Sequence, residues 1–170
     1  MTIYSGIVKC AVSLTDKDRI EPGTTFASWV VVADCAGFTG FPDGTTFASW
    51  VEVTDCAGFT GSANCTYRGH PIAYGEEANA RIRNIAEAIK RQPERLKMDD
   101  WHCGTSHCLA GWGVHQEGEA GYALERELQE VGDERPTAGA GLILLGLEAA
   151  GMFYATEDTT ARDWLASKLQ

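Results

Sequence analysis

The sequence predicts an α+β protein in which a short β-solenoid, or a sheet of repeated β-hairpins, packs against a C-terminal α-helical domain. Three observations predict it: a tandem duplication in the first half, a six-residue spacing of large residues across it, and a helical spacing afterwards. TTFASWVVVADCAGFTGFPDG (24–44) directly precedes TTFASWVEVTDCAGFTGSANC (45–65), with 15 of 21 positions identical. Such a repeat is expected to bury its apolar face against its own copy.

Before the duplication, residues 3–23 contain one apolar alternation and a charged turn, which predicts one or two strands that begin the sheet. From Ile20 a large residue recurs every six positions, with one three-residue skip, and a small or β-branched residue follows most of these anchors at the fourth position. This spacing is typical neither of a helix nor of an alternating strand. The anchors are Ile20, Phe26, Val32, Phe38, Phe41, Phe47, Val53, Phe59 and Cys65.

A large anchor with a small residue four positions later resembles the hexapeptide repeats of left-handed β-helices. Pentapeptide-repeat solenoids, which use Phe or Leu anchors in coils near twenty residues, resemble this stretch about as well. Either resemblance implies that equivalent residues stack, with Trp29 over Trp50 and Cys35 over Cys56. The alternative is a small antiparallel sheet of two repeated hairpins with glycines at the turns.

The second half changes to a helical period after a Gly- and Pro-containing junction at residues 69–75. We therefore place a repeat domain at 1–70 and a helical domain at 75–170. Thr105 or Ser106 is the expected N-cap of the second helix, which runs through His115. The expected helices are 76–91, about 106–115, 122–131, one central core helix over 137–154, and 159–169.

The charge balance is strongly acidic, with a net charge of -10 and a pI near 4.8. This argues against direct nucleic-acid binding and fits either a plainly soluble acidic protein, which is the commoner case, or one that presents an anionic face to a basic partner. The only basic concentration is residues 76–97, whereas the segment from Met98 onward carries most of the negative charge. No signal peptide or membrane span is predicted, which suggests a cytoplasmic protein with mostly reduced cysteines.

The segment from Trp101 to Trp112 concentrates histidine and cysteine and supports an alternative, a zinc- or thiol-dependent enzyme. A cysteine in the first turn of a helix would have its thiolate favoured by the helix dipole. The spacing lacks the second ligand pair of structural zinc sites, and a Cys103–Cys108 disulfide or two buried thiols beside small residues is the preferred interpretation. The leading interpretation includes no catalytic residue, metal or cofactor. The residues of the alternative are Cys103, His107, Cys108 and His115.

The sequence His-Cys-Gly-Thr-Ser-His-Cys-Leu-Ala-Gly-Trp (102–112), followed by a Leu-rich helix, resembles a group of small phage and mobile-element proteins across roughly residues 76–170. That setting implies a non-enzymatic accessory protein, of the anti-CRISPR or other anti-defence kind, that binds and blocks a nucleic-acid-handling complex in the host cytosol. Structural or assembly proteins, with a homodimer formed through an open solenoid end, are the third possibility. The repeat-borne binding candidates are Trp29, Asp34, Asp43, Trp50, Glu52 and Asp55.

Overall fold

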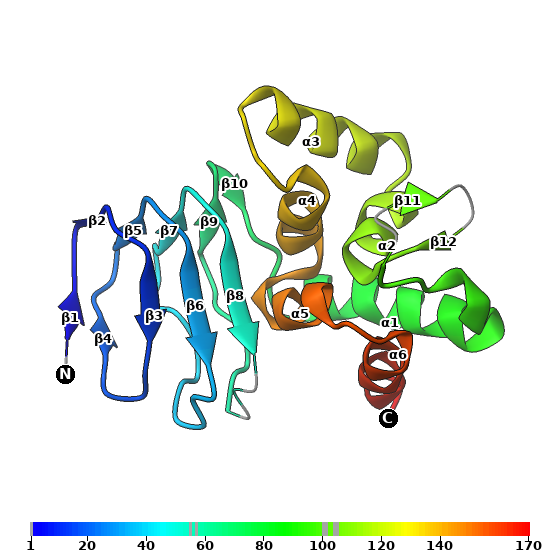
Figure 1. The fold of residues 1–170 in the computed structure, drawn as a ribbon, viewed down its shortest axis with the longest axis horizontal. Helices are drawn as coiled ribbons and strands as arrows, with labels where there is room; N and C mark the ends of the chain where they lie inside the picture. The colour runs from blue at the N-terminus through cyan, green and yellow to red at the C-terminus, as the bar shows by residue number, and fades with distance from the viewer. Residues whose placement is uncertain (1, 55, 57, 100–101, 104–105) are drawn as a thin grey trace.

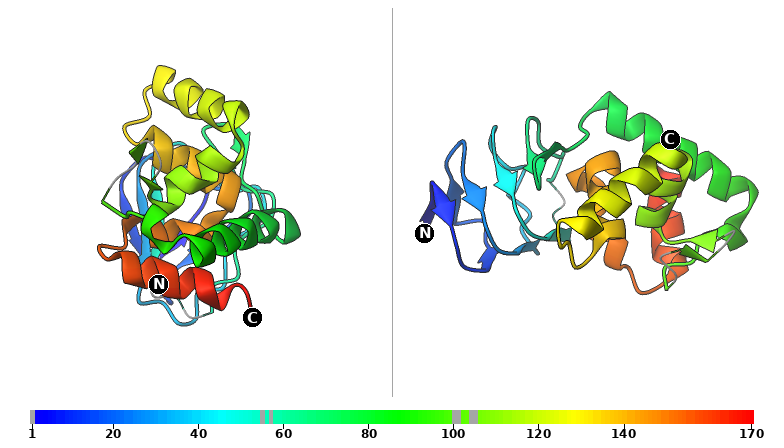
Figure 2. Two further views of the ribbon diagram at one scale, coloured as in Figure 1. Left: turned by 90° about the vertical axis from the view of Figure 1, so that its right-hand side faces the viewer. Right: turned by 90° about the horizontal axis from the view of Figure 1, so that it is seen from above.

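The computed structural model describes residues 2–54, 56, 58–99, 102–103 and 106–170, without the side chains of 102 and 103. The strands of the first half occupy one end of the molecule, and the helices, with a small pair of strands among them, occupy the other (Figure 1). The N-terminus lies at the outer end of the stacked strands, far from the helices (Figure 1 and the right view of Figure 2). The α+β class predicted from the sequence is confirmed.

The first half is a three-sided β-solenoid rather than a set of hairpins, because equivalent strands pair in parallel. One side contains β1 and β4, the second β2, β5, β7 and β9, and the third β3, β6 and β8. Among the described strands of this half, β10 alone pairs antiparallel, on β9. The strands are β1 (Ile3–Tyr4), β2 (Ile7–Val8), β3 (Val12–Leu14), β4 (Arg19–Ile20), β5 (Thr25–Phe26), β6 (Val30–Ala33), β7 (Thr46–Phe47), β8 (Val51–Thr54), β9 (Thr66–Tyr67) and β10 (His70–Pro71).

The coil length changes along the solenoid, which explains the three-residue skip in the anchor spacing. Thr25 pairs with Ile7, 18 residues earlier, and with Thr46, 21 residues later, whereas Thr46 pairs with Thr66 after 20. The strands keep their register, so the additional residues lie in the corner loops that follow β6 and β8. The duplication is therefore one complete coil and its copy.

Aromatic stacking between coils forms the interior of the solenoid. The rings of Phe26 and Phe47 are nearly parallel with centroids 5.9 Å apart, and both side chains are fully buried. Phe41 meets the Phe47 ring edge-on at 4.8 Å. Phe38 stacks on Phe59 at 5.9 Å in the same arrangement, nearer the surface. The predicted anchors are thus all core residues or packed against the core.

The second half contains six α-helices within the described residues, with a small hairpin before the second helix. The hairpin joins β11 (His102–Cys103) to β12 (Ser106–His107). None of these helices combines the length and apolarity needed to cross a membrane. The helices are α1 (Glu76–Arg91), α2 (Leu109–Gln116), α3 (Glu119–Glu130), α4 (Pro136–Leu145), α5 (Leu147–Ala150) and α6 (Asp158–Ser167), with 3-10 turns η1 (Pro93–Arg95) and η2 (Gly151–Tyr154).

The expected single core helix over 137–154 is wrong, because the chain breaks at Gly146. Gly146 has φ 83° and ψ 170°, a conformation that glycine adopts without the steric cost of a Cβ atom. A Cβ atom there would lie 2.7 Å from the carbonyl oxygen of Ala73. The break lets the chain that enters α1 pass close to α4, where Ala73 donates its amide to Ile143 at 2.8 Å.

The second expected detail that differs is the start of α2. Cys108, not Ser106, is the N-cap, and its sulfur accepts a hydrogen bond from the Gly111 amide at 3.4 Å. Ser106 instead belongs to β12, and Thr105 lies outside the described residues. Ser106, which the capping pattern predicted as the N-cap, therefore pairs in a strand instead of starting the helix.

The solenoid and the helices share one hydrophobic core. Gly151, at the start of η2, lies so close to β8 that a Cβ atom would be 2.1 Å from the Val53 carbonyl oxygen. Gly139 of α4 is similarly close to the Tyr67 ring of β9. Helices therefore cover the last coil directly, as expected for the cap of a short solenoid.

We predict that Phe47→Ala destabilises the protein by about 3–5 kcal/mol, because it removes a ring stacked between two coils and leaves a cavity. Chemical denaturation monitored by circular dichroism would measure the free energy of unfolding. Val131→Ala, at a side chain 58% exposed, is the matched control and should change stability little. A similar small loss for both variants would contradict the stacking account.

Candidate functional site

The predicted binding residues Trp29, Trp50 and Glu52 lie together on the outer face of the β3–β6–β8 sheet. Trp29 and Trp50 precede equivalent strands, and their ring centroids are 6.3 Å apart. Glu52 lies two residues after Trp50, so it points to the same face as the alternation requires. Trp29 is 42% exposed and is one of few large exposed apolar side chains among the described residues.

The other predicted binding residues do not join this group. Asp34 lies at the opposite end of β6 from Trp29 and is exposed, with a left-handed φ of 55°. Asp43 lines a different hollow, of about 550 Å³, formed by the corner loops of successive coils. Asp55 lies outside the described residues. The structure thus brings together the aromatic part of the predicted site and separates two of its carboxylates from it.

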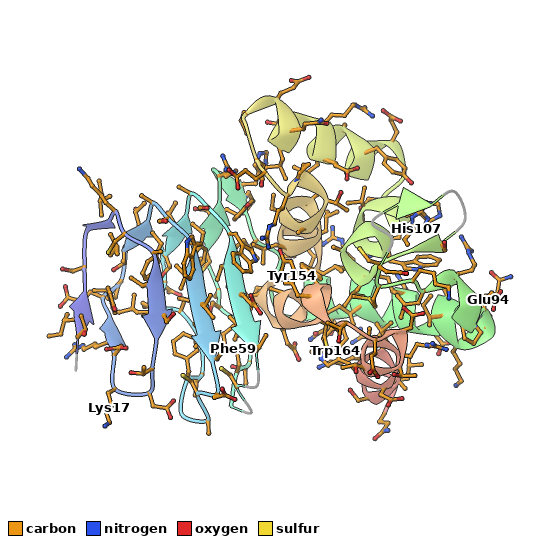
Figure 3. The ribbon with its side chains drawn as sticks, in the orientation of Figure 1. Lys17, Phe59, Glu94, His107, Tyr154 and Trp164 are labelled. Atoms are coloured by element: carbon orange, nitrogen blue, oxygen red, sulfur yellow. The ribbon has the colours of Figure 1, made fainter. Side chains whose placement is uncertain are left out.

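The turn between α3 and α4 supplies the residues that the sequence did not indicate. Arg135 lies over the Trp50 ring at 4.4 Å and over the Tyr154 ring at 5.3 Å. Tyr154 meets Trp50 edge-on at 5.3 Å and lies at the boundary between strands and helices (Figure 3). Arg135 is therefore held between two aromatic rings, an arrangement that attracts its positive charge to their faces.

We call the hollow formed here the seam groove. It has a volume of about 400 Å³, and a neighbouring pocket of about 460 Å³ shares Glu134 and Arg135 with it. The solenoid supplies one wall and the α3–α4 turn the other. The seam groove is lined by Trp29, Ser49, Trp50, Arg68, Gly132, Asp133, Glu134 and Arg135.

Asp133 fixes the α3–α4 turn to the solenoid. Its side chain is 4% exposed and lies 3.3 Å from Nε of Arg68. The Tyr67 hydroxyl donates to Oδ2 at 2.7 Å, and the Arg135 amide donates to Oδ1 at 2.9 Å. A buried carboxylate needs such partners, because burying it unpaired would be costly. These bonds hold Arg135 in place beside the tryptophans.

The electrostatics of the groove combine a paired interior with an open acidic rim. Burial raises the pKa of Glu52, and the nearby Arg135 partly opposes this shift. Glu134 is exposed at the rim, and α3, which leads into the turn, carries further exposed carboxylates. The indole Nε1 of Trp50 is buried without a hydrogen-bond partner among the described residues. The groove therefore offers exposed aromatic surface beside negative charge.

The residues of the alternative, a zinc- or thiol-dependent enzyme, lie in a different environment. The Cys108 thiol is almost fully buried, and burial raises its pKa to about 11. The thiolate-favouring effect expected at a helix N-terminus is therefore outweighed by desolvation. His107 and His115 stack at 4.4 Å, and Nδ1 of His115 lies 3.0 Å from the Tyr122 hydroxyl.

The metal interpretation gains no support from the side chains that the structure describes. No group of three or more His, Cys, Asp or Glu side chains among them is arranged to hold an ion. The side chain of Cys103, one of the four predicted ligands, is outside the described set. His107 lies within the helical half, away from the seam groove (Figure 3).

Two of the four basic side chains of α1 form ion pairs with neighbouring carboxylates. Arg81 contacts Glu77 and Glu117 at 2.9 Å each, and Arg83 contacts Glu76. This fits the interpretation of a solvated helix face better than that of an anion-binding patch.

Fold and site together define an α+β protein in which a capped β-solenoid and a helical bundle enclose a groove lined by two tryptophans, two arginines and two carboxylates. Comparisons with protein-family models, curated proteins and solved structures gave no match.

We predict that Tyr67→Phe lowers stability by about 1–3 kcal/mol, because the buried Asp133 loses its closest side-chain donor. Burial and Asp133 raise the pKa of Tyr67, so the wild type should lose stability as the pH rises above about 10, where only the unfolded state ionises. The variant should lose less over that range. Denaturation at several pH values measures both effects, with the exposed Tyr74→Phe as control.

We also predict that Cys108 reacts slowly with iodoacetamide at neutral pH, because its buried thiol stays protonated. The exposed Cys10 should react rapidly, and denaturant should remove the difference. Mass spectrometry of peptides from partly labelled protein would measure each rate. Equal rates for the two cysteines in the native protein would restore the nucleophile hypothesis.

Proposed function

We propose that this protein is an acidic, non-enzymatic interaction protein that binds a partner with a basic surface through the seam groove. The observation that supports it best is Trp29, a large exposed aromatic ring beside a second tryptophan and next to carboxylates. Aromatic anchors of this kind dominate binding energy in many interfaces. A lysine or arginine of the partner would find both an aromatic face and negative charge there.

The charge distribution supports the same proposal. Most of the net charge of -10 is carried by residues after Met98, and Asp133 and Glu134 bring part of it to the groove. Such a field accelerates encounter with a positively charged partner and makes the association sensitive to salt. The hydrogen bonds of Asp133 with Tyr67 and the Arg135 amide keep the groove preformed, which lowers the entropy cost of binding.

In its finer form, the proposal makes the partner a nucleic-acid-handling complex, which this protein inhibits by covering a basic surface. The resemblance of residues 76–170 to phage and mobile-element proteins supports this form, with anti-CRISPR or other anti-defence activity as the expected biology. Any competition with nucleic acid would arise from the acidic rim rather than from a duplex-like array, because the repeat carboxylates that the structure describes, Asp34, Asp43 and Glu52, do not lie together.

We predict that a partner captured by the wild-type protein is released by salt and by Trp29→Ala. Removing the ring should weaken binding of the purified pair by roughly 30-fold, equivalent to about 2 kcal/mol. Tyr74→Ala is the matched control, since it removes an aromatic side chain of similar exposure, 46%, outside the groove. Pull-down at two salt concentrations, followed by calorimetry on the pair, measures both effects.

A partner whose binding ignores both salt and Trp29→Ala would overturn the proposed site. The finer proposal has its own readout, the displacement of labelled nucleic acid from the purified partner by increasing amounts of this protein. Binding without displacement would leave the interaction protein and remove the nucleic-acid inhibitor.

A further inference from the structure

We infer that the N-terminal end of the solenoid is a self-association surface that accepts the same end of a second copy of this chain. The two ends of the solenoid differ in how their edges are covered. At the far end, helices cover β8, and the antiparallel β10, which includes Pro71, covers β9. At the near end, β1, β2 and β3 each have a neighbouring strand on one side only within the described residues.

The hydrogen-bond pattern identifies the backbone groups that this edge presents. The carbonyls of Gly6 and Val8 accept amides of the next coil at 2.8 Å each. In a parallel ladder the residue between them directs its amide and carbonyl the other way, so those of Ile7 face outward. The same alternation turns the backbone of Ile3 and Ser13 outward. Each side of the coil thus offers donors and acceptors to a further strand.

The geometry favours a second coil end over a single extended peptide. The three edge strands contain only two, two and three residues and lie on three different sides of the coil. One extended peptide could pair with only one of them, which is too short a ladder for stable association. Another coil end, related by a two-fold axis across the solenoid, presents edge strands on all three sides at once. Such an isologous contact closes at the dimer.

Charge and apolar exposure point to the same occupant. Residues 2–23 contain three basic and three acidic side chains, so this end is neutral in a chain of net charge -10. Two copies therefore meet there without a local excess of like charge. Ile3 and Ile7 are 52% and 67% exposed at the same end, among the few large apolar side chains so exposed in the described chain. Their burial would add to the backbone pairing.

Sedimentation equilibrium of the full chain, from low micromolar to near-millimolar concentration, tests the inference. We expect a reversible dimer that salt strengthens, because screening reduces repulsion between two chains of net charge -10. Salt acts in the opposite direction on the proposed basic partner, so the two proposals fail independently. A monomer throughout this range would overturn the inference.

Variants and hydrogen exchange locate the contact. The double variant Ile3→Lys with Ile7→Lys should raise the dimer dissociation constant by about tenfold or more, because charges on an edge oppose strand pairing. Val131→Lys makes the same change at an exposed site in the helical half and should leave the constant unchanged. Circular dichroism confirms that each variant folds. The amides of Ile7 and Ser13 should exchange more slowly as the wild type dimerises. A dimer without this protection uses another face and contradicts the inference.

Discussion

In-register parallel pairing between successive coils is the constraint on which the rest of this structure depends. It places Thr25 beside Thr46 and Phe26 beside Phe47, so every side chain inherits the orientation of its equivalent in the next coil. The interior fills with stacked rings, and the same repetition places Trp29 beside Trp50 on the outside. One duplication thus builds both the core and the aromatic floor of the seam groove.

The second half makes this repeated surface one wall of the seam groove. Asp133 accepts hydrogen bonds from the Tyr67 hydroxyl and from the Arg135 amide, and it forms an ion pair with Arg68 of the last coil. Covering a solenoid end requires only apolar contact, but the contacts of Asp133 also fix the guanidinium of Arg135 over the Trp50 ring. The stability of the protein and the shape of the seam groove therefore depend on the same few residues, and a substitution that loosens these contacts would affect both.

Local pattern was sufficient to predict a repeated β structure, because its anchors repeat and each repeat contacts its neighbours. It left a solenoid and a sheet of hairpins open, and the parallel pairing of equivalent strands decides for the solenoid. Helix α1 was equally accessible, since its apolar face has a clear 3.6-residue period. The break at Gly146 could not be predicted in this way, because its cause is the close approach of Ala73, which lies more than seventy residues earlier in the sequence. Only part of the seam groove could be predicted. The two tryptophans recur in the repeat, whereas Arg135, Asp133 and Tyr154 come close to them only through tertiary packing. For Cys108, the position at a helix N-terminus suggests an activated thiolate, but tertiary packing buries the thiol and raises its pKa.

The close approach of Gly151 to the Val53 carbonyl has a consequence for how such a protein can change in length. The helical half recognises only the last coil, and the N-terminal end belongs only to the first. A further 21-residue unit inserted between Gly44 and Thr45 would extend the stack while leaving both ends as they are. The tryptophan column would grow by one ring, and its last member would still lie beneath Arg135. The aromatic surface can therefore lengthen in whole coils, by duplication alone, without redesign of the groove that ends it.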